Sequence, residues 1–317
     1  FALIKKSDVI LHNFRAGVVD RLGLDYDSVR AINPSIVYTV ISGFGAKGPR
    51  SADPAYDGAV QAAAGMMANN GTAESGPLRT GYMPVDLMTG MTAAYATTAA
   101  LLRKQKTGKG QMVDVAMLDC AITLGSANFS RSEVDDIPDM LIGNQSITSA
   151  PTASSFPTAE GSILTAAIMP NHVEAFFDEI GLNEMLNDPK FATREARIEN
   201  KEIVRDAIIE ALKSDTAENW EKRLAPRGVP VAKINSVKET ARLEQLQYRN
   251  ILTAVPPAKG MENGYRLPGA PFTNSEDGPE VMRPAPVLGQ HTLEILEEIG
   301  IDKSFIITLA AEGVICM

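Results

Sequence analysis

Short, almost continuous hydrophobic runs alternate with helix-like segments at the start of the chain. Residues 8–14 (DVILHNF) and 35–45 (SIVYTVISGFG) are runs of this kind, and the helix-like segment between them, 17–34, ends in Asn-Pro. Such runs are typical of parallel strands that are buried on both faces. The pattern predicts a β-α-β unit, and the loops that follow its two strands should meet at the sheet edge where α/β proteins bind ligands.

Two alanine-rich segments follow, and both have the composition of helices. They cover 54–68 and 89–105, and the second is followed by the glycine-rich stop TGKG at 107–110. A further apolar run, 111–118, predicts a third strand. We therefore expect one large α/β domain over residues 1–133.

The composition changes after this first domain. Residues 134–160 are rich in Ser, Thr, Pro and Gly and predict a linker. Strand-like runs at 162–169 and 229–235 flank segments whose apolar residues recur every three or four positions, as in amphipathic helices. This predicts a smaller α/β domain over 161–275, followed by a C-terminal arm and helices over 276–317 that return to the large domain.

Charge and composition exclude several classes of function. The 317 residues carry a formal net charge of −9, which argues against a nucleic-acid-binding protein or an anionic-membrane-binding protein. No apolar run is long enough to span a membrane. The two cysteines and three scattered histidines form neither a disulfide framework nor a metal-ligand pattern. We expect a cytoplasmic protein without a metal, and a local basic pocket could still bind an anionic ligand.

Asp86 precedes the second alanine-rich segment, in TGYMPVDLMTGM. An aspartate at this place is usually a helix N-cap. The positive end of a helix also favours the ionised carboxylate, and an ionised carboxylate in a cleft can attack a carbonyl and form a covalent intermediate. Gly81 and Gly90 on either side would let a bulky ligand approach the backbone. The sequence alone allows both functions for Asp86.

The end of the first predicted strand, HNFRAGVVDR, carries a small cationic cluster. Arg15 and Arg21 could hold phosphates, and Phe14 could stack on a purine ring. The alternative is that both arginines are solvated or are paired with Asp20 and Asp25.

Taken together, these segments resemble the class III CoA-transferases, the CaiB/BaiF family that includes formyl-CoA transferase. The resemblance covers essentially the whole chain, through DVILHNFRAGVVDRLGLDYDSVRAINPSIVYTVISGFGAKGP, AYD, VDLMTGM, LRKQKTGKGQMVDVAMLD, FPTAEG, DPKFATREARIENK, RGVPVAKINSV and MRPAPVLGQHT. It implies an α/β fold with a Rossmann-like large domain and a smaller α/β domain, in an interlocked, ring-like homodimer. Family members carry a further β-α-β stretch ahead of residue 1, so the N-terminal part of the large domain would be missing.

The resemblance also implies functions for particular residues. Asp86 matches the catalytic aspartate that attacks the acyl-CoA thioester, and Asp57 matches an acidic residue near the catalytic centre. The residues that match positions around coenzyme A are Asn13, Phe14, Arg15, Arg21, Tyr56 and Met117. The linker NQSITSAPTASSF lacks the glycine run of formyl-CoA transferase, which argues against formate specificity.

The implied reaction moves CoA from an acyl-CoA donor to a carboxylic acid through an aspartyl anhydride and an aspartyl-CoA thioester. Its substrates would be an acyl-CoA and a carboxylic acid. One alternative is an isomerase of the α-methylacyl-CoA racemase type, although Tyr56 stands where the racemases have a histidine, and tyrosine is a poor base at neutral pH. The other alternative is a non-catalytic CoA-binding protein.

Overall fold

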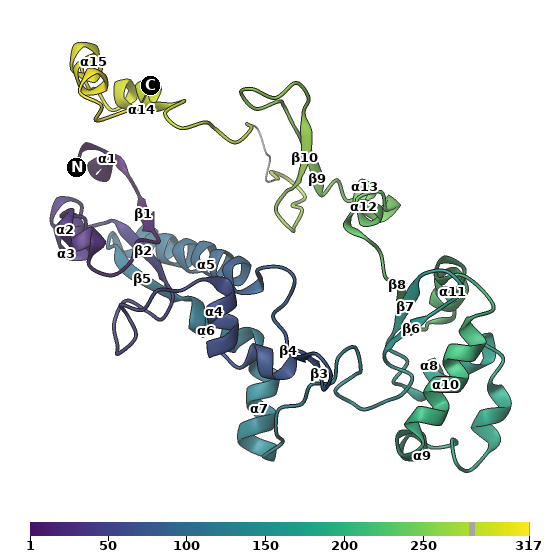
Figure 1. The fold of residues 1–317 in the computed structure, drawn as a ribbon. Helices are drawn as coiled ribbons and strands as arrows, with labels where there is room; N and C mark the ends of the chain where they lie inside the picture. The colour runs from purple at the N-terminus through teal and green to yellow at the C-terminus, as the bar shows by residue number, and fades with distance from the viewer. Residues whose placement is uncertain (279–282, 317) are drawn as a thin grey trace. The chain divides into compact units, whose positions relative to one another are not determined.

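The chain forms two compact units in the computed structural model, which describes residues 1–278 and 283–316 (Figure 1). The first unit comprises residues 1–155 and 184–205, and the second comprises 156–183 and 206–317. Residues 279–282, which belong to the predicted C-terminal arm, lie outside the described residues.

A three-stranded parallel sheet forms the centre of the first unit. Its strands are β1 (Val9–His12), β2 (Val37–Ser42) and β5 (Gln111–Ala116), in the order β1-β2-β5. Val37 pairs with both Val9 and Gln111, so the three strands run in register and end at one edge. This confirms the predicted α/β class and the parallel strands.

Helices pack on both faces of this sheet, which explains why β2 is hydrophobic without alternation. Tyr38 and Val40 pack with Val29 of α3 (Tyr26–Ile32) on one face. Ile41 packs with Ala93 of α5 (Pro84–Thr107) on the other face, and α5 runs along the sheet (Figure 1). The buried hydroxyl of Thr39 is 2.7 Å from that of Thr97, a polar contact that links the sheet to α5.

The helix α5 is longer than the segment 89–105 that the sequence predicts. It begins at Pro84, because proline has no N–H to leave unpaired at a first helical position. It ends at Thr107 and is capped by Gly108, whose φ of 70° lies in the left-handed region that favours glycine. The predicted helix 54–68 is in turn shorter, since it divides into α4 (Asp57–Ala63) and the 3-10 helix η1 (Met66–Asn69) around Gly65.

The first unit contains further short elements around this framework. They are α1 (Ala2–Lys6), α2 (Val18–Arg21), the hairpin β3 (Gly71–Thr72) and β4 (Gly76–Pro77), α6 (Met117–Leu124), α7 (Ser126–Asp135) and α9 (Arg194–Glu199). The chain passes from one unit to the other within three elements, which are β6 (Ser155–Pro157), η2 (Asn183–Asn187) and α10 (Lys201–Leu212).

The second unit contains the sheet β6 (Ser155–Pro157), β7 (Ser162–Thr165) and β8 (Val231–Lys233), in that order, with β7 and β8 antiparallel. Phe176 of α8 (Pro170–Glu179) packs against Phe156 and Phe177. The indole N–H of Trp220 donates to the Leu212 carbonyl at 2.9 Å. The other elements are α8 (Pro170–Glu179), α11 (Ala217–Leu224), η3 (Ala225–Arg227), α12 (Val237–Thr240), α13 (Glu244–Tyr248), β9 (Leu252–Val255), β10 (Tyr265–Pro268), α14 (Thr292–Glu298) and α15 (Lys303–Ala311).

Within residues 1–278 and 283–316, no helix combines the length and the apolar character needed to cross a membrane.

Candidate active site

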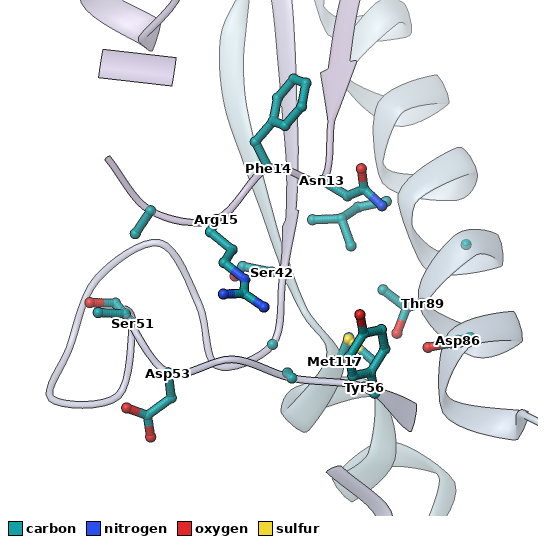
Figure 2. A pocket seen from close by; sticks show the side chains of 16 residues that line it. Asn13, Phe14, Arg15, Ser42, Ser51, Asp53, Tyr56, Asp86, Thr89 and Met117 are labelled. Atoms are coloured by element: carbon teal, nitrogen blue, oxygen red, sulfur yellow. The ribbon is translucent and has the colours of Figure 1, made fainter. Parts of the chain in front are cut away.

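A pocket of about 450 Å³ lies where the three parallel strands of the first unit end (Figure 2). Asn13, Phe14 and Arg15 follow β1, Ser42 ends β2, and Met117 follows β5. The loop 51–56 and the first turns of α5 complete the lining. The pocket therefore occupies the carboxyl edge of the sheet, where the strand pattern predicts a ligand site.

Asp86 lines this pocket from the first turn of α5 (Figure 2). It is the third residue of the helix, while the N-cap position belongs to Met83, which makes no side-chain cap. The N-cap role that the sequence favours for Asp86 is therefore wrong, because the helix begins two residues before it. Among the described residues, none donates a hydrogen bond to the Asp86 carboxylate.

Asp53 is the other carboxylate in the pocket lining, and its surroundings differ. It forms an ion pair with Arg50, with 2.8 Å between Nε and Oδ2, and its side chain points away from Asp86 in Figure 2. Asp86 is thus the pocket carboxylate that remains available to a ligand.

Burial, and after it the negative charge of Asp57, raises the pKa of the Asp86 carboxyl above its ordinary value. The positive end of the helix predicts the opposite direction. The difference arises first from burial, which disfavours the charged form, and then from Asp57, whose negative charge lies at the same helix end and whose Oδ2 accepts the N–H groups of Val85 and Asp86.

Asp57 is the first residue of α4 and is 6% exposed. Its Oδ2 accepts hydrogen bonds from the backbone N–H groups of Val85 at 2.9 Å and of Asp86 at 3.0 Å. Asp57 therefore caps α5 from another helix, and it lies beneath the pocket, outside the lining residues. No local sequence pattern around the start of α5 predicts a cap from a residue this distant in the chain.

The second oxygen of Asp57 connects to a buried polar network. Gln61, one turn further along α4, donates from Nε2 to Asp57 Oδ1 at 2.5 Å and to the Thr80 hydroxyl at 3.0 Å. The Thr80 N–H donates to Gln61 Oε1 at 3.0 Å, and its hydroxyl donates to the Tyr82 carbonyl at 2.9 Å. The network fastens the segment ahead of α5 to α4.

Thr89 and Gly90 also line the pocket, one turn along α5 from Asp86. The Thr89 hydroxyl is turned back onto the helix, where it donates to the Val85 carbonyl at 2.7 Å. A Cβ added to Gly90 would meet no atom within 4 Å, so the glycine leaves open space beside Asp86. Gly81, the other glycine that we singled out, does not line the pocket.

A second, smaller pocket of about 220 Å³ adjoins the first. The two pockets share five lining residues, which are Phe14, Arg15, Ala16, Ser42 and Ser51. The small pocket also has the aromatic side chains of Tyr26 and Tyr38 and the cationic Lys47 in its lining. The carboxylates of Asp20 and Asp25 line the small pocket as well. Together the pockets form a site with one end near Asp86 and an aromatic end whose lining carries both positive and negative side chains.

His12 fixes the loop that joins the two pockets. Its Nδ1 accepts the Phe14 N–H at 3.3 Å, so Nε2 carries the proton and donates to the Tyr38 hydroxyl at 2.8 Å. The hydroxyl in turn donates to the Leu24 carbonyl at 2.7 Å. Burial lowers the pKa of His12 and is the main cause that raises the pKa of Tyr38 to about 12, so both groups remain neutral. The Phe14 ring stacks on His12, with centroids 5.9 Å apart.

Neither Arg15 nor Arg21 forms an ion pair with any described residue, in contrast to the alternative that pairs them with Asp20 and Asp25. Asp25 instead caps α3 through the N–H groups of Asp27 and Ser28. Arg15 lines both pockets. Arg21 lines neither, although its guanidinium lies beside Gly17, which belongs to the small pocket.

The structure thus brings together most of the residues predicted from the sequence. Asn13, Phe14, Arg15, Tyr56, Asp86 and Met117 line the large pocket. Asp57 contacts the backbone of Asp86 from outside this lining, and Arg21 lies beside the small pocket. Sequence reasoning missed Gln61, Thr89 and the loop 51–55. The i, i+4 spacing of Asp57 and Gln61 on α4 could have indicated Gln61, and Gly90, which we singled out, adjoins Thr89. No local signal indicated the loop 51–55. The His, Cys, Asp and Glu side chains of the described residues form no group of three or more that could hold a metal ion.

Residues 1–292 match the family described as CoA-transferase family III. A "Succinate--glutarate CoA-transferase" of Agrobacterium fabrum is 30% identical, over 94% of this chain and 74% of the relative. A "Formyl-CoA:oxalate CoA-transferase" of Streptomyces coelicolor is 31% identical, over 99% of this chain and 79% of the relative. The crystal structure of a CaiB/BaiF family protein from Brucella suis superposes with a TM-score of 0.81 at 27% identity, covering 94% of this chain and 77% of that one.

Proposed function

Because the chain belongs to CoA-transferase family III, we propose that it transfers CoA from an acyl-CoA donor to a small carboxylic acid by covalent catalysis at Asp86. The observation that supports this most strongly is that the Asp86 carboxylate lines the pocket at the strand ends and has no hydrogen-bond donor among the described residues. A carboxylate with a raised pKa and no such partner is the more reactive of the two in the pocket.

The proposed reaction has two matched halves. The Asp86 carboxylate attacks the thioester carbonyl, the C–S bond breaks, and an aspartyl–acyl anhydride and the CoA thiolate form. The thiolate then attacks the aspartyl carbonyl, which releases the donor acid and leaves an aspartyl-CoA thioester. The acceptor carboxylate repeats these steps in reverse order. Each step exchanges one activated acyl bond for another, so the reaction needs no external energy source.

We place the nucleotide of CoA in the small pocket and its thiol end in the large one. Phe14 is 52% exposed and lies beside the aromatic end of the site, where a purine would stack on its ring. Arg15 stands between the pockets and Lys47 lines the small one, so both can attract phosphates. Arg21 would add a third positive charge at the border of this pocket.

We further propose that the protein acts as a homodimer. One row of α5 side chains, Leu87, Met91 and Tyr95, recurs every four residues and is 60–76% exposed in the single chain. Tyr56 of the pocket lining is 79% exposed. An exposed apolar row of this length is typical of a protein–protein interface. A second copy of the chain would bury it, as in the ring-like dimers that the resemblance implies.

The names of the relatives favour a dicarboxylic acid as acceptor. Succinate, glutarate and oxalate appear in them, and each carries a second carboxylate. A short acid of this kind would fit beside Gly90, where the helix leaves space. We propose succinyl-CoA and a small dicarboxylate as the first substrates to test.

The test is to incubate the protein with succinyl-CoA, quench it with acid and search by mass spectrometry for an adduct on the peptide that contains Asp86. We expect a CoA or acyl adduct on Asp86, and hydroxylamine should convert it to a hydroxamate. Asp86→Ala should bind CoA and form no adduct, whereas Asp53→Asn, which removes the other pocket carboxylate, should retain the adduct.

An adduct that persists in Asp86→Ala, or CoA exchange at the wild-type rate in that variant, would contradict the proposal. Incorporation of deuterium from the solvent into the α-carbon of a bound acyl-CoA, without CoA exchange, would favour the isomerase alternative. Tight CoA binding with neither reaction would favour a non-catalytic protein.

A further inference from the structure

Asp57 is a buried carboxylate that is bonded to the backbone of Asp86 but does not line the pocket. It is 6% exposed and lies behind the pocket lining, so an acyl-CoA in the pocket does not reach it. Its two oxygens nevertheless accept three hydrogen bonds, and two of the donors are the N–H groups of Val85 and Asp86. The group is therefore connected to the nucleophile through the backbone.

These hydrogen bonds supply acceptors for the N–H groups at the start of α5. The first N–H groups of a helix have no partner within the helix. Met83 provides no side-chain cap, and Pro84 has no N–H to donate. The next two N–H groups both point to Asp57 Oδ2, at 2.9 and 3.0 Å. The turn that carries the nucleophile is therefore held by a residue of another helix.

Asp57 is itself held in place on its other side. Gln61 is 1% exposed and donates to Asp57 Oδ1, and it exchanges hydrogen bonds with Thr80. The carboxylate therefore cannot rotate without breaking this network. The Asp57 carboxylate therefore fixes the backbone of the first turn of α5 relative to α4.

We propose that Asp57 is a positioning residue of the CoA-transfer reaction, which holds the backbone of Asp86 and acts on its carboxylate through charge without reacting with the substrate. This rests on the proposed function of Asp86 as the nucleophile. Asp57 is the nearest negative charge in the same network, and its effect opposes the attraction of the helix end for the Asp86 anion.

The charge of Asp57 favours the chemical step. The Asp86 carboxylate is an anion before attack and is neutral in the anhydride and the thioester. The negative charge moves from Asp86 to the thioester oxygen and then to the CoA thiolate. Repulsion between the two carboxylates therefore destabilises the starting state and weakens as the bond forms, which lowers the barrier. The other charged or titratable groups around Asp86 are Arg15, Asp53 and Tyr56 in the pocket lining, and Arg79, which lies against Gly58 of α4.

The experiment measures kcat and kcat/KM against pH for the wild type, Asp57→Asn and the double variant Asp57→Asn/Gln61→Glu. The amide introduced by Asp57→Asn retains one oxygen for the two N–H groups but presents its NH₂ to Nε2 of Gln61. In the double variant, the carboxylate introduced by Gln61→Glu accepts a hydrogen bond from that NH₂. The double variant therefore restores the hydrogen bond between residues 57 and 61 and keeps an acceptor for the Thr80 N–H, although residue 61 no longer donates to the Thr80 hydroxyl. It also moves the negative charge one side chain away from Asp86. It keeps the test possible if Asp57→Asn alone fails to fold.

We expect the acid limb of kcat/KM to move to lower pH in both variants, because the charge that raises the pKa of Asp86 is removed or displaced. We expect kcat to fall about tenfold or more in Asp57→Asn, because a small displacement of a nucleophile costs this much. Gln61→Met is the matched control: it should lower the melting temperature and leave the acid limb at its wild-type position.

Unchanged acid limbs and unchanged kcat in both Asp57 variants would overturn the proposal while the adduct on Asp86 still stands. An adduct on the peptide that contains Asp57 would also overturn it, since Asp57 would then react directly. The absence of an Asp86 adduct in the wild type would instead refute the proposed function, so the two failures are distinguishable.

Discussion

Gly90 offers a test in which stability and activity are expected to change in opposite directions. It is the seventh residue of α5, and glycine inside a helix is about 1 kcal/mol less favourable than alanine. A Cβ at this position would meet no atom within 4 Å, so Gly90→Ala should recover most of that difference without a clash. We expect α5 to be stabilised by about 1 kcal/mol.

Hydrogen exchange followed by mass spectrometry, on peptides from residues 84–107, is the appropriate assay. The single tryptophan, Trp220, belongs to the second unit, so its fluorescence would not report on α5. A gain of about 1 kcal/mol should slow the exchange of protected α5 amides about fivefold. Thr98→Ala, at a site of α5 outside the pocket lining, should also slow exchange, by a smaller factor, and leave turnover unchanged.

A side chain larger than alanine at position 90 should lower the activity. Gly90→Leu would place three further carbons in the space beside Asp86, and we expect kcat/KM for succinyl-CoA to fall at least about tenfold while α5 remains as protected as in Gly90→Ala. Faster exchange in Gly90→Ala would show that the space is not open. Wild-type kcat/KM in Gly90→Leu would show that the substrate does not occupy it.

The remaining predictions concern charge, packing and assembly. Asp86→Asn should stabilise the protein at neutral pH, because a raised folded-state pKa means that ionised Asp86 opposes folding. The increase in the denaturation midpoint should become smaller as the pH falls through the pKa of Asp86 in the folded protein. An increase that does not depend on pH would contradict this prediction. Arg15→Gln should weaken CoA binding about tenfold by calorimetry at low salt and less at high salt; an unchanged Kd would remove Arg15 from the phosphate site. Gly43→Ala should destabilise the protein by about 1–3 kcal/mol in denaturation followed by circular dichroism, because its Cβ would lie 2.2 Å from that of Ala55; a neutral effect would mean that the loop yields. Tyr95→Glu should shift the protein toward the monomer in sedimentation; an unchanged mass would assign the α5 row to another partner.

The strands of the parallel sheet were predictable from the sequence to within a few residues, because hydrophobic runs closed by glycine depend on local composition. The strands β3, β4, β6, β9 and β10 were not predicted. The runs 8–14 and 35–45 contain β1 and β2. Residues 111–118 contain β5, but Met117 already begins α6, since nothing in an apolar run distinguishes its last strand residue from a first helical one.

The start of α5 was not predictable in the same way. Its cap is Asp57, which lies 28 residues before Val85 in the sequence, and the contact exists only once α4 has packed beside it. The raised pKa of Asp86 also comes from tertiary packing, first from burial and then from the charge of Asp57. The placing of Phe14, Arg15 and Asp86 around one pocket came from the parallel order of the strands and from the family resemblance. The domain boundaries and the roles of the site residues stay predictions.

Two rows of side chains on α5 lie next to each other. Leu87 and Met91 follow Asp86 and Gly90 by one residue each, and one residue on a helix corresponds to about 100° of rotation. A second chain that covers the apolar row would stand at the rim of the pocket. The reactive aspartate would then sit at a seam between two polypeptides, and dilution of the protein until the copies separate would open that seam to water and favour hydrolysis of the acyl-enzyme.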